Sequence, residues 1–143
     1  MNYEDLEDKH LIISYKASPE QIEKELRLAR RDLRVAQKNL EEDYDWAFAI
    51  AYNAVLQAGR ALMLSKGYRP RGQEQHKTVL KFLERSLGKD FSRKARFLDQ
   101  MRSKRHRVIY DEPELISESE AKFAIKSASE VVDLVSRELK QKR

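Results

Sequence analysis

Hydrophobic residues in the segment after Ser18 recur with the period of a helix. Ser18 can cap a helix, Pro19 suits its first position, and Gln21 completes a capping box. The apolar positions that follow are spaced four, three, four, three and four residues apart: Ile22, Leu26, Ala29, Leu33, Ala36 and Leu40. This spacing predicts an amphipathic helix from residue 19 to about residue 42.

The next segment, residues 44 to about 66, is apolar on every side rather than along one stripe. Six alanines alternate with large apolar residues there, which lets neighbouring elements approach closely. A helix of this kind usually lies buried at the centre of a protein. We therefore expect its aromatic residues in the core: Trp46, Phe48 and Tyr52. Asp43 or Asp45 can cap its start, and Gly67 ends it.

Glycine and proline divide the rest of the chain into three more helical segments. They are expected at residues 74–87, 91–110 and 117–139. Gly88 stands where a helix usually ends, and Ser117 with Glu120 forms a second capping box. About five helices with short connections predict an all-α fold, an up-and-down helical bundle.

Two segments lack a helical pattern. Residues 67–72 are expected to form a loop, because they contain two glycines and a proline. Residues 1–17 are ambiguous, since Leu11, Ile12 and Ile13 suit either a short strand-like arm or packing against a partner. We divide the chain into an N-terminal arm, 1–17, and a helical domain, 18–143.

The composition excludes several kinds of chemistry. The 143 residues include no cysteine, which excludes disulfides, thiolate zinc sites and cysteine nucleophiles. The three histidines, His10, His76 and His106, are too scattered for metal-ligand spacing, and no glycine-rich phosphate loop occurs. We expect no metal and no cofactor, and we expect His76 to be a surface or capping residue rather than a ligand.

Nothing in the pattern predicts a membrane protein. The acidic start does not resemble a signal peptide, and the longest uncharged run, residues 46–59, is too short to span a bilayer. We expect a soluble, cytoplasmic protein without a membrane partner.

The most informative stretch is strongly basic. Residues 93–107 contain seven Lys or Arg residues and one Asp, a local charge of +6 in a chain of net charge +5. Such a cluster favours polyanions such as RNA, DNA or nucleotide phosphates. A solvated basic helix face is the alternative. A helix-turn-helix is a third option, disfavoured by the long flanking helices and the few Asn and Gln residues.

Helical geometry sorts the side chains of this stretch onto two faces. An apolar stripe is expected along one of them: Phe91, Ala95, Leu98 and Met101. Arg105 continues that stripe, where a guanidinium is costly unless it is paired or lies at an opening. Arg102, His106 and Tyr110 follow one another at four-residue spacing along the adjacent face. Together they can grip a phosphate, titrate near neutral pH, and donate a hydrogen bond or stack on a base.

At this point the chain resembles a known family, the HEPN domain (higher eukaryotes and prokaryotes nucleotide-binding). The resemblance covers residues 19–138. It rests on the amphipathic first helix, the aromatic and alanine-rich segment 45–54, Gly67, and His76 at the start of the next helix. It also rests on the family signature, an arginine with a polar neighbour followed a few residues later by a histidine. Arg105 and His106 match the first part of that signature.

The resemblance implies a function and partners. It implies binding of RNA or nucleotides, and in the family's ribonucleases a metal-independent cleavage in which the 2′-hydroxyl attacks the adjacent phosphate. It also implies a homodimer, and pairing with a minimal nucleotidyltransferase as toxin and antitoxin. The alternative is a non-catalytic dimeric nucleotide-binding or protein-interaction module.

This chain departs from the signature at one position. Tyr110 stands where the signature histidine is expected. A phenol, with an ordinary pKa near 10, is a poor general base at neutral pH. His106 lies one turn before Tyr110 and can substitute as the base. Pairing Arg102 with His106 instead leaves a gap of three residues, outside the usual spacing.

The predicted site has two parts. The candidate catalytic residues are Arg105, His106 and Tyr110, and the candidate nucleotide- or RNA-binding residues are Arg102, Lys104, Arg107 and Asp111. In the enzymatic version Arg105 stabilises the phosphate charge, and in the binding version the same residues hold RNA without cleaving it. In a purely structural version Arg105 pairs with Asp111 or Glu112 and closes the end of the helix.

Overall fold

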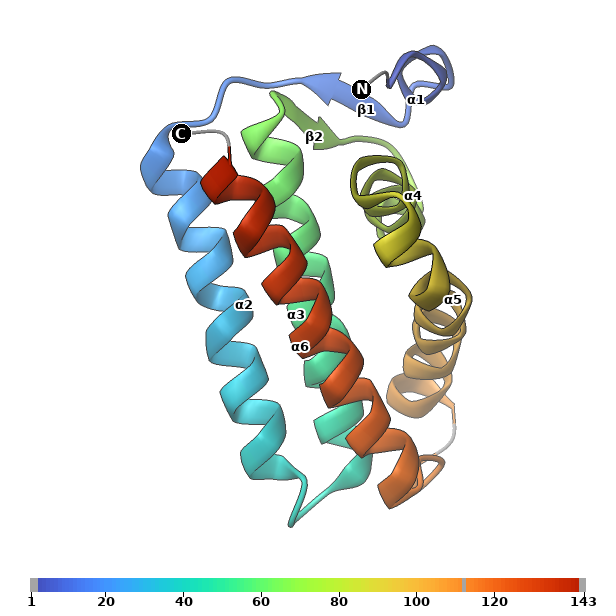
Figure 1. The fold of residues 1–143 in the computed structure, drawn as a ribbon. Coiled ribbons are helices and arrows are strands. Elements are labelled where there is room, and N and C mark those ends of the chain that lie inside the picture. The colour runs from blue at the N-terminus through green and yellow to red at the C-terminus, as the bar shows by residue number, and fades with distance from the viewer. Residues whose placement is uncertain (1–2, 112, 142–143) are drawn as a thin grey trace.

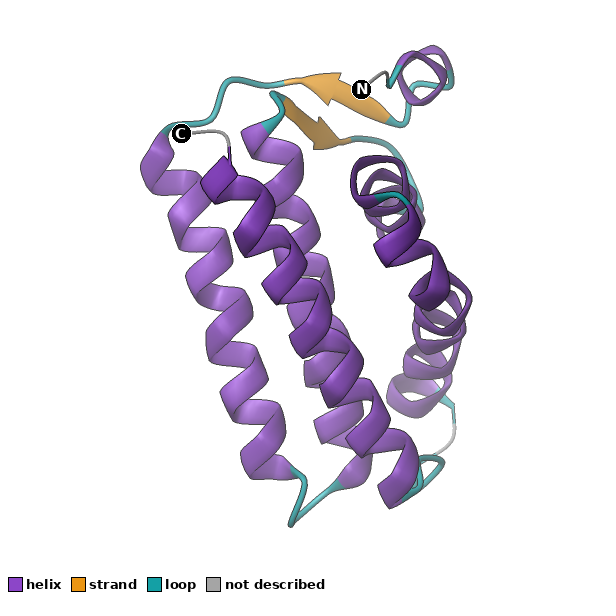
Figure 2. Ribbon diagram, in the orientation of Figure 1, coloured by secondary structure: helices purple, strands orange, loops and turns teal. Residues whose placement is uncertain are grey.

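The computed structural model describes residues 3–111 and 113–141, which form six helices and a two-stranded sheet (Figures 1 and 2). In chain order the elements are α1 (Glu4–Asp8), β1 (Ile12–Ser14), α2 (Pro19–Asn39), α3 (Tyr44–Ser65), β2 (Tyr68–Pro70), α4 (Gln75–Leu87), α5 (Lys89–Tyr110) and α6 (Glu118–Gln141). The long helices α2, α3 and α6 lie side by side, while α4 and α5 pack on the other flank of α3 (Figure 1). The predicted all-α bundle is confirmed.

The helix ends follow the predicted capping chemistry. Gln21 N donates to Ser18 Oγ at 3.2 Å and Ser18 N donates to Gln21 Oε1 at 2.9 Å, which is the expected capping box of α2. Asp43 caps α3 by accepting from Trp46 N at 3.1 Å. Asp45 acts elsewhere, because its carboxylate accepts from the backbone of the loop before α6, including Ile116 N at 3.0 Å. This contact ties the loop that follows α5 to the start of α3.

Helix α3 is the core of the bundle, as its sequence predicts. Phe48 and Tyr52 are buried to within 1% of full burial, together with almost all of the alanines. By length and composition alone α3 could cross a membrane, but most of it is buried inside the bundle, as in the core helix of a soluble protein. The expectation for Trp46 is wrong, since its side chain is 55% exposed. It lies in the first turn of α3, at the end of the bundle.

The N-terminal arm contains structure that the sequence pattern did not predict. Strand β1 pairs antiparallel with β2, with Ile12 opposite Pro70, so the strand-like alternative is correct and the expected loop 67–72 contains a strand. The short helix α1 was not predicted, because five residues are too few to show a period. Tyr3, just before α1, stacks on Phe82 of α4 with ring centroids 4.3 Å apart and hydrogen-bonds Ser86 at 2.7 Å.

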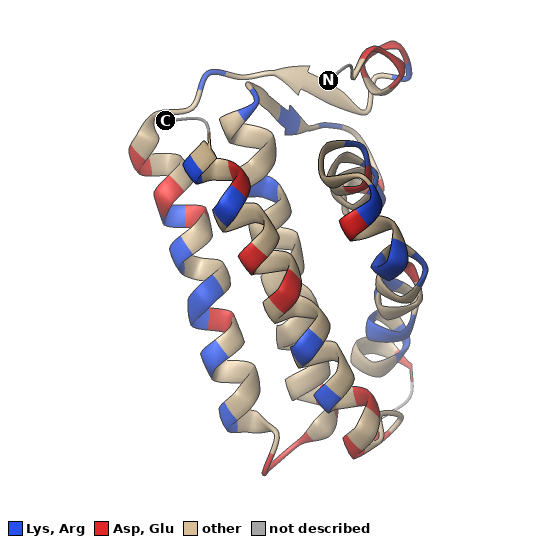
Figure 3. Cartoon of the chain, in the orientation of Figure 1, with Lys and Arg blue, Asp and Glu red and all other residues tan. Residues whose placement is uncertain are grey.

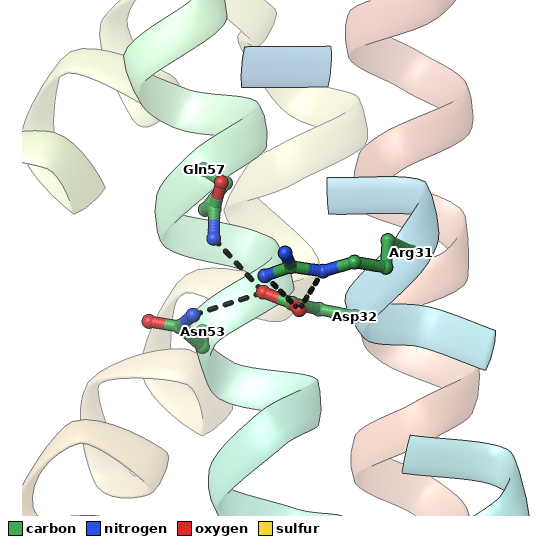
Figure 4. A network of polar contacts seen from close by, with 4 residues as sticks. All are labelled: Arg31, Asp32, Asn53 and Gln57. Atoms are coloured by element: carbon green, nitrogen blue, oxygen red, sulfur yellow. Dashed lines mark hydrogen bonds and ion pairs between the residues drawn. The ribbon is translucent and has the colours of Figure 1, made fainter. Parts of the chain in front are cut away.

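A buried carboxylate joins α2 to α3 (Figure 4). Asp32 is 5% exposed and accepts from Asn53 Nδ2 and Gln57 Nε2, both at 2.9 Å. Arg31, which is largely exposed, donates to the other carboxylate oxygen at 3.0 Å. The two amide hydrogen bonds contribute most of the stabilisation at this contact, because an exposed ion pair contributes little.

We expect Asp32→Ala to lower the free energy of unfolding by about 2–3 kcal/mol, since it leaves two amide groups of α3 without their acceptor. Urea unfolding measures the change. The matched control is Asp133→Ala on the exposed side of α6, which should stay within about 0.5 kcal/mol of wild type. An equal loss of unfolding free energy in both variants would contradict a stabilising role of the Asp32 hydrogen bonds.

Candidate functional site

The basic helix α5 and the beginning of α4 meet because the chain reverses at Gly88. Gly88 has a φ of 62°, a left-handed conformation that glycine adopts without steric cost, and it both ends α4 and precedes α5. The start of α4 consequently lies beside the C-terminal half of α5. Figure 3 shows Lys and Arg side by side along α5, whereas α6 mixes both signs of charge.

A hollow of about 450 Å³ lies between these two helix segments. From α5 it is lined by Arg102, Arg105, His106 and Tyr110, and from the start of α4 by Glu74, Gln75, His76 and Lys77. Its volume is in the range of small-ligand sites, about 300–1,000 Å³. The structure therefore brings together all three candidate catalytic residues and one candidate binding residue, in one cavity.

Arg105 lies at the inner wall of the hollow, as its place on the apolar stripe predicts. Its side chain is half-buried, and its Cζ lies 5.8 Å from the ring centroid of Tyr52 in the core. Its Nε is buried and has no hydrogen-bond partner among the described residues. Within these residues no ion pair joins it to Asp111, and Glu112 lies outside them. A buried donor of this kind costs about 1–3 kcal/mol until an acceptor reaches it.

The three residues expected on the adjacent face of α5 do share one surface. Arg102 is half-buried and its Nε donates to Asp99 at 3.2 Å. The rings of His106 and Tyr110 are 4.8 Å apart. Tyr110 is 70% exposed, so its ring is accessible at the mouth of the hollow. A guanidinium, an imidazole and a phenol thus face the same space.

The other predicted binding residues lie outside this hollow. Lys104 is held by an ion pair with Glu120 of α6, so it ties α5 to α6 instead of facing a ligand there. Arg107 is exposed on another side of α5. Asp111 is the C-cap of α5, where its backbone N–H donates to the carbonyl oxygen of Arg107 at 2.8 Å. Sequence spacing could not separate these side chains, because it does not show where α4 and α6 pack.

His76 is a further residue of the hollow, and its spacing in the sequence did not predict this position. It is not a cap: it lies in the first turn of α4, half-buried, with its ring centroid 5.8 Å from that of Tyr52. Burial lowers the pKa of His76, and the positive charges of Arg105, Arg60 and Arg102 lower it further. No spacing rule links it to α5, since the two helices meet only through the fold. Its one sequence signal is its place at the start of a helix in the family resemblance.

Tyr52 forms the floor behind these groups. Its side chain is fully buried, and its hydroxyl has no hydrogen-bond partner among the described residues. Burial is the main reason that the pKa of Tyr52 is raised, against the opposing effect of Arg102 and Arg105. The phenol consequently stays neutral, and its ring offers its face to the Arg105 guanidinium.

Other parts of the described chain offer less chemistry. A larger hollow of about 640 Å³ lies between α2 and α6. Its lining includes Arg27, Arg30 and Lys140 beside aliphatic side chains, but no imidazole or phenol. Within residues 3–111 and 113–141 no group of three or more His, Asp or Glu side chains is placed to hold a metal ion. The α4–α5 hollow is therefore the candidate site.

Comparison with known proteins finds a family match. Residues 22–139 match the family described as HEPN domain, which is more than half of the chain and includes every residue of the hollow. No curated protein matches the sequence.

The arginines around His76 give a testable electrostatic effect. We expect an NMR titration to place the pKa of the His76 imidazole below its ordinary value of about 6.5, and Arg105→Ala to raise it. Between the lowered folded-state pKa and about pH 6.5 the unfolded chain then binds a proton that the folded chain does not, so the free energy of unfolding falls as the pH is lowered through this window. Arg34→Ala, on the exposed face of α2, is the control and should leave the titration of His76 unchanged.

Proposed function

The chain belongs to the HEPN domain family, whose functions concern nucleotides and RNA, and we propose that this protein binds RNA with a phosphate held in the α4–α5 hollow. One observation carries the proposal. The buried Nε of Arg105 has no hydrogen-bond partner among the described residues, and its guanidinium borders an open cavity. A phosphate is the ligand that the guanidinium at the cavity wall fits best, because charge-assisted hydrogen bonds are the stronger kind.

The rest of the hollow supports the same ligand. Arg102 supplies a second guanidinium for the phosphate, and the exposed ring of Tyr110 is placed to stack on an adjoining base. The surrounding basic stretch of α5 attracts the polyanion over a longer range.

Metal-independent RNA cleavage is the second candidate function, and one observation favours it. Two histidines and two arginines line one hollow, so groups that transfer protons lie beside groups that bind a phosphate. The 2′-hydroxyl would attack the adjacent phosphate while Arg105 stabilises the developing charge. The alternative is a non-catalytic module, which would bind the same RNA and leave it intact.

The family membership extends the proposal to partners and location. We propose that the protein acts in the cytoplasm as the toxin-like component of a pair with a minimal nucleotidyltransferase, and that it forms a homodimer. One exposed hydrophobic residue near the end of α5, Ile109, supports a dimer contact beside the hollow. Such a contact would bring two hollows close together.

We expect Arg105→Ala to weaken RNA binding by about 10- to 100-fold, since a hydrogen bond to a charged group is worth about 1.5–3 kcal/mol. Fluorescence anisotropy with a labelled single-stranded 2′-O-methyl RNA, which cannot be cleaved by its 2′-hydroxyl, measures the affinity. The salt dependence should also become shallower, by about 0.7 in the logarithmic slope for one lost phosphate contact.

Arg34→Ala is the matched control for this experiment, because it removes the same charge from the exposed face of α2. Its affinity should stay within about threefold of wild type, a difference of about 0.6 kcal/mol. A similar loss of affinity in both variants would mean that RNA binding depends on the overall basic charge and not on the hollow. A lower melting temperature of Arg105→Ala without any change in affinity would support the structural version instead.

The dimer is tested independently of RNA. Sedimentation equilibrium should give about twice the chain mass of 16.9 kDa. Ile109→Lys should shift the protein to the monomer, because it places a charge in the proposed apolar contact. Val35→Lys is the matched control, since Val35 on α2 has the same exposed fraction, 36%, as Ile109. A monomeric wild type would rule the dimer out.

A further inference from the structure

We infer that His76 of α4 is the general base of the proposed RNA cleavage and takes the place of the imidazole that the signature position, Tyr110, lacks. This inference rests on the proposed function. It assigns a catalytic group from outside helix α5, which carries every residue of the family signature. His76 lines the hollow from α4, and His106 lines it from α5. Arg102 and Arg105 lie in the α5 wall of the same hollow.

The position of His76 is fixed by the fold on several sides. Its ring contacts the ring of Tyr52, which is fully buried in α3. Thr78 and Val79, two and three residues further along α4, are buried in the core and hold the first turn of α4 against it. Glu74, which precedes α4, adopts a left-handed φ of 54°, a conformation that costs a residue other than glycine about 1 kcal/mol or more. This turn directs the start of α4 across the end of α5.

The charges that face His76 select its protonation state. Arg60 of α3 and Arg102 and Arg105 of α5 lie around it, and Lys77 pairs with Glu74 on its own helix at 3.2 Å. The core side is closed by the neutral Tyr52. Burial and these cations keep the imidazole neutral near pH 7, so it holds a free lone pair. A neutral imidazole accepts a proton, which is the task of the base in the attacking step.

The reaction then balances with the groups present. His76 takes the proton of the 2′-hydroxyl, the 2′-oxygen forms a bond to phosphorus, and the bond from phosphorus to the 5′-oxygen breaks. His106 in its protonated form gives a proton to the leaving 5′-oxygen. Arg105 and Arg102 hold the non-bridging oxygens as their charge grows. The products are a 2′,3′-cyclic phosphate and a 5′-hydroxyl, and the two imidazoles exchange their protons with solvent.

The test compares wild type with His76→Asn and with His10→Asn, each as the full-length protein. His10 lies in the exposed turn after α1, outside the hollow, and its left-handed φ of 57° is one that asparagine tolerates. Cleavage of a labelled single-stranded RNA is followed in EDTA, and binding is measured with the 2′-O-methyl RNA. We expect His76→Asn to cleave at least about 100-fold more slowly, the usual worth of a general base, with Kd within about threefold. His10→Asn should match wild type in both.

Two further measurements separate catalysis from a structural role. The wild-type cleavage rate should follow a bell-shaped pH profile, because the base must be deprotonated and the acid protonated, and His76→Asn should lose the acidic limb of this profile. Added imidazole should restore part of the cleavage by His76→Ala, which a misfolded variant would not show. Melting temperatures of the variants report any loss of stability.

The outcomes distinguish the inference from the proposal on which it rests. Cleavage by His76→Asn at the wild-type rate, or with an unchanged acidic limb, overturns the role of His76 and leaves the RNA site intact. Binding without cleavage by wild type also overturns it and supports the non-catalytic module. An absence of RNA binding by wild type overturns the proposed function itself.

Discussion

The burial of α3 on all of its sides is the constraint on which the rest of the structure depends. A helix that is apolar all round must be covered, and here α2 and α6 cover one flank while α4 and α5 cover the other. Helix α4 packs tightly against α3 at Gly59, where an added Cβ would overlap Cγ1 of Val79. Because Val79 lies one turn after His76, the packing that buries α3 also fixes the imidazole at the mouth of the hollow.

The same burial sets the electrostatics of the site. Tyr52 extends from α3 beneath both Arg105 and His76, so each of these polar groups has a hydrophobic core on one side and the open hollow on the other. In such surroundings a guanidinium gains from an anion more than it does in water, and an imidazole beside cations loses its proton more easily. The arginines therefore have two effects: they attract a phosphate and they keep the neighbouring histidine neutral. Both effects follow from where α5 crosses α3.

Structural features that depend on neighbours along the chain could be predicted from the sequence. The capping boxes at Ser18 and Ser117, the helix end at Gly88 and the shared face of Arg102, His106 and Tyr110 are all local, and the structure contains each of them. Features that depend on contacts between distant segments could not be predicted in this way. The pairing of β1 with β2, the exposure of Trp46 and the capture of Lys104 by Glu120 belong to this class, because periodicity shows which face is apolar and not what covers it.

His76 belongs to the second class, and this explains how a signature that is incomplete along one helix leaves two imidazoles in the hollow. Helix α5 by itself contributes two arginines, one exposed imidazole and a phenol to the hollow. The fold adds a half-buried histidine from 26 positions before Arg102, with the arginines of α5 and α3 as its neighbours. Chemistry at a phosphate requires groups in space rather than in sequence order. A tyrosine at the signature position therefore removes an imidazole from the helix without removing an imidazole from the hollow.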